Sequence, residues 1–139
     1  MAMPWEPAKL PLFGEDPYHD VEVNGVRLRY VDTGGSGRTI LMLHGLNQHY
    51  RVYELVLPAL AGLGRIIIPD HRGHGGSDRP DVTYTPGCLV DDYRQFVQKL
   101  GLPRPVVVGH SLGGWIGFQL AGRYPDLLGA LVAADIAPG

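Results

Sequence analysis

The sequence of 139 residues lacks several features that would point to a function class at once. It has a single cysteine, Cys88, which excludes an internal disulfide. Its 12 Lys and Arg residues are outnumbered by 14 Asp and Glu and form no basic stripe, which argues against a nucleic acid or an anionic membrane as partner. No apolar run approaches the length of a membrane span. We therefore expect a soluble, cytoplasmic protein.

The chain divides into two parts by composition. Residues 1–18 are rich in proline and acidic side chains, and they have neither the basic leader nor the apolar stretch of a signal peptide. In residues 19–139, glycines and prolines fall between periodic segments, where they mark turns. This pattern predicts one domain over residues 19–139, preceded by a Pro-rich segment.

Strand patterns of two kinds follow one another. In residues 19–31, apolar side chains alternate on either side of Asn24-Gly25, a dipeptide typical of a two-residue hairpin because both turn positions need φ > 0. The later runs are short and almost entirely apolar, as in parallel strands that are buried on both faces. These runs are residues 39–43, 66–68, 106–108 and 128–134.

Helical patterns separate the apolar runs. The clearest begins at Thr85-Pro86, an N-cap residue followed by proline at the first helical position. We expect a second helix over residues 111–123 and a third over residues 51–61, broken or kinked at Pro58. A hairpin followed by alternating strands and helices predicts an α/β fold, with a mostly parallel sheet, helices on both faces and an N-terminal antiparallel hairpin.

One serine lies in a turn of distinctive composition. The segment Gly109-His110-Ser111-Leu112-Gly113 directly follows the run 106–108 and opens the second helix, which is the strand–turn–helix context of a nucleophile elbow. Such a turn holds its serine in strained φ and ψ angles, with Oγ above the carboxyl edge of the sheet. Because the helix N-terminus offers free N–H groups to a developing oxyanion, we predict that Ser111 is a catalytic nucleophile. An ordinary Gly-flanked turn is the alternative.

A second segment ends an apolar run beside this turn. His44-Gly45-Leu46 directly follows the run 39–43. The backbone N–H of Leu46, together with that of Leu112, would make a two-donor oxyanion hole. We interpret the His44 side chain as a structural loop residue, because the backbone at this position matters more than the imidazole.

A third segment, residues 70–78, reads Asp-His-Arg-Gly-His-Gly-Gly-Ser-Asp. Charges and glycines at this density predict a tightly hydrogen-bonded loop. His71 and His74 are candidates for a catalytic or metal-binding role, but a three-residue spacing in a Gly-rich loop is weak support for a ligand pair. We therefore favour a structural role for both, and we predict no metal and no cofactor.

Together and in this order, the three motifs resemble those of the α/β-hydrolase superfamily, in particular its single-domain esterases, lactonases, perhydrolases and carbon–carbon bond hydrolases. His44-Gly45, Asp70-x-Arg72-Gly73-x-Gly75-x-Ser77 and Gly109-His110-Ser111-Leu112-Gly113-Gly114 match the family's positions, and the resemblance covers residues 21–134. It implies cleavage of an ester or related acyl bond in a small-molecule substrate, through an acyl-serine intermediate. Serine at position 111 argues against the haloalkane dehalogenases and epoxide hydrolases, which resemble this sequence but have Asp there.

The family pattern also includes residues that have no counterpart in this chain. In the family the triad runs Ser, then Asp or Glu, then His, with the acid and the His beyond the strand at 128–134. All six His residues of this chain precede Ser111. We therefore expect the N-terminal part of a hydrolase domain, truncated before the last strands, lid and catalytic His, and inactive alone. Asp135 is a candidate acid because some members take it from this position; a structural or loop-capping role is the alternative.

Two further expectations follow. Residues 128–134 would form an open apolar sheet edge, which pairs with another chain or with a missing C-terminal half.

The competing function is a non-catalytic, hydrolase-like module that binds a small molecule. An intact Ser111 with both oxyanion loops favours the enzyme.

Overall fold

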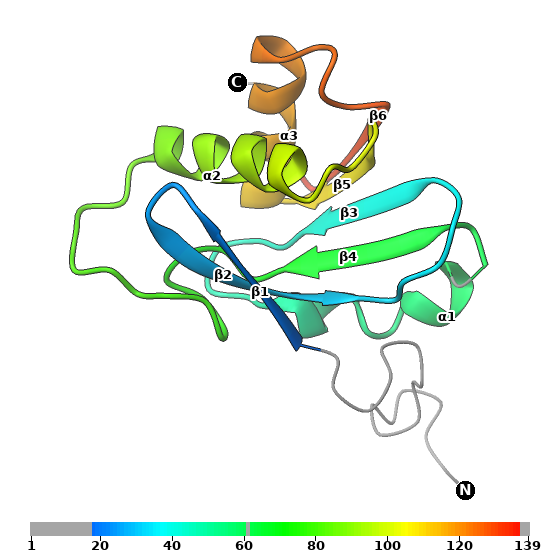
Figure 1. The fold of residues 1–139 in the computed structure, drawn as a ribbon, viewed down its shortest axis with the longest axis horizontal. Coiled ribbons are helices and arrows are strands. Elements are labelled where there is room, and N and C mark those ends of the chain that lie inside the picture. Colours follow the sequence, from blue (N-terminus) through cyan, green and yellow to red (C-terminus); the bar gives the residue numbers. More distant parts are fainter. Residues whose placement is uncertain (1–17, 61, 137–139) are drawn as a thin grey trace, which may run out of the picture.

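The computed structural model describes residues 18–60 and 62–136, which form a six-stranded sheet in the order β1-β2-β4-β3-β5-β6 (Figure 1). The strands are β1 (Tyr18–Val23), β2 (Val26–Asp32), β3 (Thr39–Leu43), β4 (Arg65–Pro69), β5 (Val106–His110) and β6 (Ala130–Ala134). Strands β4, β3, β5 and β6 pair in parallel, whereas β1 and β2 form an antiparallel hairpin and β2 runs antiparallel to β4. The predicted fold class is confirmed.

The predicted hairpin turn has the expected backbone. Asn24 and Gly25 have φ angles of 49° and 76°, and Val23 pairs with Val26 on either side of them. The Asn24 side chain donates a hydrogen bond of 3.0 Å to Asp92 of the helix α2 (Pro86–Lys99). The turn therefore fixes the hairpin against a helix that lies far away in the sequence.

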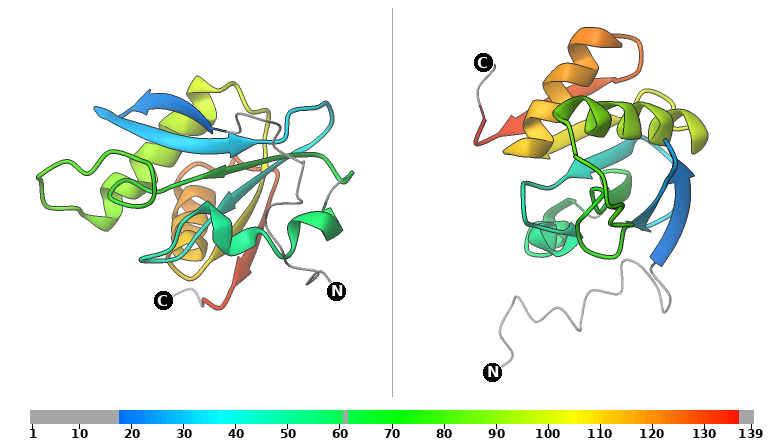
Figure 2. Two further views of the ribbon diagram at one scale, coloured as in Figure 1. Left: turned by 90° about the horizontal axis from the view of Figure 1, so that it is seen from below. Right: turned by 90° about the vertical axis from the view of Figure 1, so that its left-hand side faces the viewer.

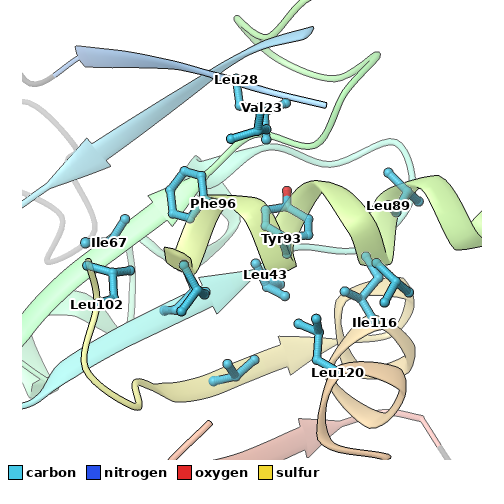
Figure 3. Packing of buried hydrophobic residues seen from close by; sticks show 14 of the residues in the cluster. Val23, Leu28, Leu43, Ile67, Leu89, Tyr93, Phe96, Leu102, Ile116 and Leu120 are labelled. Carbon is cyan, nitrogen blue, oxygen red and sulfur yellow. The ribbon is translucent and has the colours of Figure 1, made fainter. Parts of the chain in front are cut away.

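Side chains of the central strands alternate between two apolar layers. Leu41 and Leu43 of β3 pack under α2 and α3 (Leu112–Arg123), and Ile40 and Met42 pack against the 3-10 helix η3 (Tyr50–Tyr53) and α1 (Leu57–Leu60). Figure 2 shows the sheet between these two groups of helices. Figure 3 shows side chains of α2 and α3 meeting those of the strands and the hairpin in the first layer. This double cover explains the nearly continuous apolar runs.

The caps of α2 follow the sequence prediction. The Thr85 side chain accepts a hydrogen bond of 3.2 Å from the backbone N–H of Cys88, and Pro86 occupies the first turn. After the helix, Gly101 adopts φ 61°. Within the described residues, none of the helices has the length and apolar character needed to cross a membrane.

Two predicted elements differ from the structure. Residues 51–61 do not form one helix kinked at Pro58: η3 ends at Tyr53, and α1 begins at Leu57, so the interruption precedes the proline. Pro58 lies in the first turn of α1, where its missing N–H breaks no helical hydrogen bond. Residue 61 lies outside the described residues, as do residues 1–17 of the predicted Pro-rich segment.

The strand predicted over 128–134 is shorter and less buried than expected. It begins at Ala130 as β6, which has only β5 as a neighbour among the described strands. Leu131 faces α3, but Val132 on the opposite face is 52% exposed. The run is therefore covered on one face only, and the prediction of burial on both faces was wrong here.

Candidate active site

The turn between β5 and α3 holds Ser111 in a strained backbone conformation. Its φ and ψ angles are 52° and −113°, a region that residues with a Cβ rarely adopt. The Ser111 N–H donates to the carbonyl of Ala134 at 3.0 Å, and the Ser111 carbonyl accepts from the N–H of Trp115 at 3.0 Å. Both backbone polar groups of Ser111 are thus fixed by neighbouring elements.

The flanking glycines are required by close backbone contacts. A Cβ at Gly109 would lie 2.3 Å from the carbonyl oxygen of Gly113, and a Cβ at Gly113 would lie 2.1 Å from the carbonyl oxygen of Leu43. One turn further along α3, a Cβ at Gly117 would lie 2.5 Å from Leu131. The small residues therefore let α3 start directly above the end of β3.

In the loop after β3, three of the four successive N–H groups of residues 45–48 are hydrogen-bonded, two within the loop and one to His74. The N–H of Gly45 donates to the Gln48 side chain at 2.8 Å, and the N–H of Gln48 donates to the Gly45 carbonyl at 3.3 Å. The N–H of Asn47 donates to Nε2 of His74 at 3.0 Å. Among these four, only the N–H of Leu46 has no partner in the described part of the chain.

A second unpaired N–H lies at the start of α3. Leu112 is the first residue of this helix, so its N–H has no intrahelical acceptor, and the described residues supply no other. The helix dipole adds positive potential there. The side chains of Leu46 and Leu112 line the same cavity of about 200 Å³, which places the two loops beside each other.

His44 and His71 are buried and fully hydrogen-bonded. Nδ1 of His44 donates to the Gly45 carbonyl at 2.7 Å, and its Nε2 accepts from the N–H of His71 at 3.0 Å. Nε2 of His71 donates to the His44 carbonyl at 2.6 Å, and its Nδ1 accepts from the Tyr93 hydroxyl. Burial lowers the pKa of His44 to about 4, and burial lowers the pKa of His71 as well. Both rings are therefore neutral and structural.

Both ring nitrogens of His74 are hydrogen-bonded to backbone groups. Its Nδ1 donates to the carbonyl of Arg72 at 2.9 Å, while its Nε2 accepts from Asn47. With both nitrogens in use, the ring has no lone pair free for a metal. Within residues 18–60 and 62–136, no group of three or more His, Cys, Asp or Glu side chains is arranged to hold a metal ion.

The loop of residues 70–78 is as densely hydrogen-bonded as its sequence predicts. The Asp70 carboxylate accepts from the N–H groups of Tyr50 and Gly76 at 2.8 and 2.9 Å, and the Ser77 hydroxyl donates to the Asp70 carbonyl at 2.7 Å. Arg72 forms a buried, bidentate ion pair with Asp92 of α2, at 2.6 and 2.7 Å. These contacts tie the loop to η3 and α2.

The two remaining polar side chains of the site are His110 and Asp135. Nδ1 of His110 lies 3.2 Å from the Gln48 side chain, and its Nε2 lies 3.8 Å from the Asp135 carboxylate. Asp135 follows β6 with φ 55°, and its side chain is 87% exposed. Gln48, which joins the loop after β3 to the serine turn, was missed by sequence reasoning because His110 is 62 residues away.

The described residues place no base against Ser111, because its Oγ has no hydrogen-bond partner among them. His44, His71 and His74 have both ring nitrogens in other hydrogen bonds, whereas Nε2 of His110 has none and lies 3.8 Å from Asp135. The site therefore combines a strained serine with two unpaired N–H groups and a carboxylate beside the turn.

Comparisons with known proteins agree with this architecture. The profile of a family described as alpha/beta hydrolase fold matches residues 38–138. A soluble epoxide hydrolase from Corynebacterium sp. (strain C12) is 37% identical over 125 residues, which are 90% of this chain and 43% of that protein. A 2-(acetamidomethylene)succinate hydrolase from Mesorhizobium japonicum is 36% identical over 104 residues, 75% of this chain and 37% of that protein.

A solved structure shows the same arrangement. The crystal structure of epoxide hydrolase A from Mycobacterium thermoresistibile superposes with a TM-score of 0.81 at 30% identity, over 88% of this chain and 40% of that one. The chain thus spans about two fifths of the length of the relatives that it matches.

Proposed function

Because the chain belongs to the α/β-hydrolase fold family, we propose that it is the nucleophile-bearing part of a serine hydrolase that cleaves an ester or related acyl bond. Ser111 attacks the carbonyl carbon, and the N–H groups of Leu46 and Leu112 receive the developing oxyanion. Collapse of the tetrahedral intermediate expels the alcohol and leaves an acyl-serine, which water then hydrolyses. We call the longer protein that would complete this reaction the parent hydrolase.

The observation that carries the proposal is a strained serine together with two unpaired N–H groups, those of Leu46 and Leu112, whose residues line one cavity. Three of the four N–H groups of residues 45–48 have acceptors, and the one without belongs to Leu46. The other free N–H, that of Leu112, directly follows Ser111 at the positive end of α3. A donor of this kind typically contributes about 3 kcal/mol to transition-state stabilisation.

The identity of the nucleophile favours an acyl substrate over an epoxide or an alkyl halide. The family's epoxide hydrolases and dehalogenases have Asp at this position. When its carboxylate attacks a saturated carbon of the substrate, the product is an ester, which water can hydrolyse. The same displacement by Ser111 would give an ether, which has no carbonyl for water to attack. Attack at a carbonyl gives an acyl-serine that remains hydrolysable.

We propose that the base lies outside the described residues, because no side chain among them is hydrogen-bonded to Oγ of Ser111. His44, His71 and His74 have both ring nitrogens in hydrogen bonds, so none can take the proton of Ser111 without losing one. Removing the His of such a triad costs roughly a million-fold in kcat. We therefore propose that the 139-residue chain alone has negligible turnover, with Asp135 as a candidate acid for the missing His.

The test is hydrolysis of p-nitrophenyl butanoate by the parent hydrolase. We expect turnover that Ser111→Ala abolishes, whereas Ser36→Ala, in an exposed loop, leaves it unchanged. Equal turnover by the Ser111→Ala variant would contradict the proposal. Turnover by the isolated chain would contradict its inactivity.

The free Ser111 hydroxyl also favours a second function for this chain. A serine without a base is compatible with a module that binds a small molecule and does not turn it over. Fluorophosphonate reacts with activated serines only, so an unlabelled parent protein that still binds an ester reversibly would favour the binding module.

A further inference from the structure

The strongest feature outside the catalytic turn is the 200 Å³ cavity that begins at the two oxyanion residues. Its wall is mostly apolar, with Leu46, Leu89 and Leu112 beside Tyr84 and Pro86. Leu46 and Tyr84 are 64% and 37% exposed, so the cavity opens at the surface. In the proposed reaction the N–H groups of Leu46 and Leu112 would bind the carbonyl oxygen of the substrate, so a cavity lined by these two residues would border the groups attached to that carbonyl.

The polar side chains in the same wall present no unpaired charged group to the cavity. The guanidinium of Arg72 is paired with the buried carboxylate of Asp92 through two hydrogen bonds. His74 uses Nδ1 and Nε2 for the Arg72 carbonyl and the Asn47 N–H. A carboxylate placed in this cavity would therefore lose its hydration without gaining a partner.

We propose that this cavity is the acyl-binding pocket of the parent hydrolase and that it selects a short, uncharged, apolar acyl group. The size limit follows from the volume, since an apolar cavity of about 150 Å³ accommodates benzene. The inference rests on the proposed function and names its substrate class. Each methylene buried in such a pocket raises kcat/KM about fourfold.

A binding experiment on the 139-residue chain tests the pocket independently of catalysis. Benzene is titrated against protein with ¹³C-labelled leucine methyl groups, and benzoate serves as the charged probe of the same size. We expect shifts at Leu46, Leu89 and Leu112 with benzene and none with benzoate. Shifts with both probes, or with neither, would overturn the proposal.

Kinetics on the parent hydrolase test the selectivity. From the p-nitrophenyl acetate to the butanoate, kcat/KM should rise about 16-fold, two methylenes at about fourfold each. It should level off at about six carbons. The hemisuccinate ester, which has the length of the butanoate and a terminal carboxylate, should be at least tenfold poorer than the butanoate. No dependence on acyl length, or equal use of butanoate and hemisuccinate, would contradict the pocket.

Two variants locate the selectivity in the cavity. Leu89→Phe reduces the volume and should lower the ratio of butanoate to acetate turnover, whereas Tyr84→Ala widens the mouth and should move the preference to longer esters. Leu63→Phe, at a position 66% exposed and not in the cavity wall, is the matched control. Because Tyr84 is partly exposed, its variant remains informative if Leu89→Phe does not fold. A failure of the proposed serine hydrolase function would differ from a failure of the pocket. Benzene would still bind, but no ester would be cleaved and Ser111 would not be labelled.

Discussion

The backbone N–H of Asn47 donates a hydrogen bond of 3.0 Å to Nε2 of His74, across 27 residues of sequence. Because the partner of Nδ1 is a carbonyl oxygen, Nδ1 holds the proton and Nε2 is the acceptor. The bond lies one residue beyond Leu46, whose N–H we assign to the oxyanion. Asn47 itself has φ 60°, so the loop needs an external contact to hold this turn.

His74 should therefore position the oxyanion donor. In the parent hydrolase, His74→Phe keeps a ring but removes the acceptor, and we expect kcat to fall about tenfold to a hundredfold. His74→Gln retains an acceptor oxygen and should recover most of the loss. His19→Phe, on the exposed β1, is the control. Equal losses in the Phe and Gln variants would indicate a packing role only.

The contact between Gly113 and Leu43 predicts an asymmetry within α3. Gly113→Ala would place its Cβ 2.1 Å from the Leu43 carbonyl oxygen and should lower the free energy of unfolding by about 3 kcal/mol. Gly122→Ala is the matched change in the same helix, where a Cβ meets nothing within 4 Å; it should raise the free energy of unfolding by about 0.5–1 kcal/mol. Urea denaturation of both variants measures the difference. Similar values for the two would contradict the close approach of α3 to β3.

The strained backbone of Ser111 should cost stability. Ser111→Gly permits φ 52° without a Cβ and should raise the free energy of unfolding by about 1 kcal/mol or more. Ser111→Ala removes the hydroxyl but retains the Cβ, and should therefore change stability little. Denaturant midpoints of the two variants separate strain from loss of the side chain. A Gly variant no more stable than the Ala variant would show that the turn is unstrained.

Burial of His44 predicts a pH-dependent stability. Its pKa is about 4 in the folded chain, whereas an unfolded histidine titrates near 6.5, so between these values the unfolded state binds more protons. The resulting contribution is fully present above pH 6.5 and is lost as the pH falls to 4, by about 3 kcal/mol. His71 acts in the same direction. Urea unfolding at pH 7 and pH 4.5 measures this slope, which His44→Asn should flatten; an unchanged slope in that variant would contradict the assignment.

The two edges of the sheet differ in charge. Strand β1 has Asp20 and Glu22, whereas β6 is made of alanine, leucine and valine only. Because uncharged edges recruit further strands, we expect the 139-residue chain to associate at high concentration. Val132→Lys should reduce this association, and Val52→Lys, at an exposed position of η3, should not. A monomer by light scattering before any substitution would contradict the prediction.

Local signals in the sequence were sufficient for most of the fold. Asn24-Gly25 predicts its turn, Thr85-Pro86 predicts the start of α2, and the serine turn predicts the boundary between β5 and α3, because each depends on neighbouring residues alone. The interruption before Pro58 was mislocated, since propensity does not distinguish a helix broken by proline from one that begins there. The exposure of Val132 depends on which elements cover β6, which no local pattern encodes.

The site was predictable in its backbone and much less so in its side chains. The strain at Ser111 and the close contacts of its glycines follow from the motif. The hydrogen bonds of Gln48 to His110 and of His74 to Asn47 join segments 62 and 27 residues apart, and only the tertiary fold brings them together. The nucleophilic role of Ser111, the oxyanion role of Leu46 and Leu112 and the role of Asp135 remain predictions.

Fluorophosphonate labelling, located by mass spectrometry of the digested protein, tests most directly whether Ser111 is an activated nucleophile. We predict a single adduct on Ser111 in the parent hydrolase at pH 8. We predict no adduct on the isolated 139-residue chain, because no described side chain is hydrogen-bonded to Oγ of Ser111. A folded parent protein in which Ser111 stays unlabelled would contradict the account.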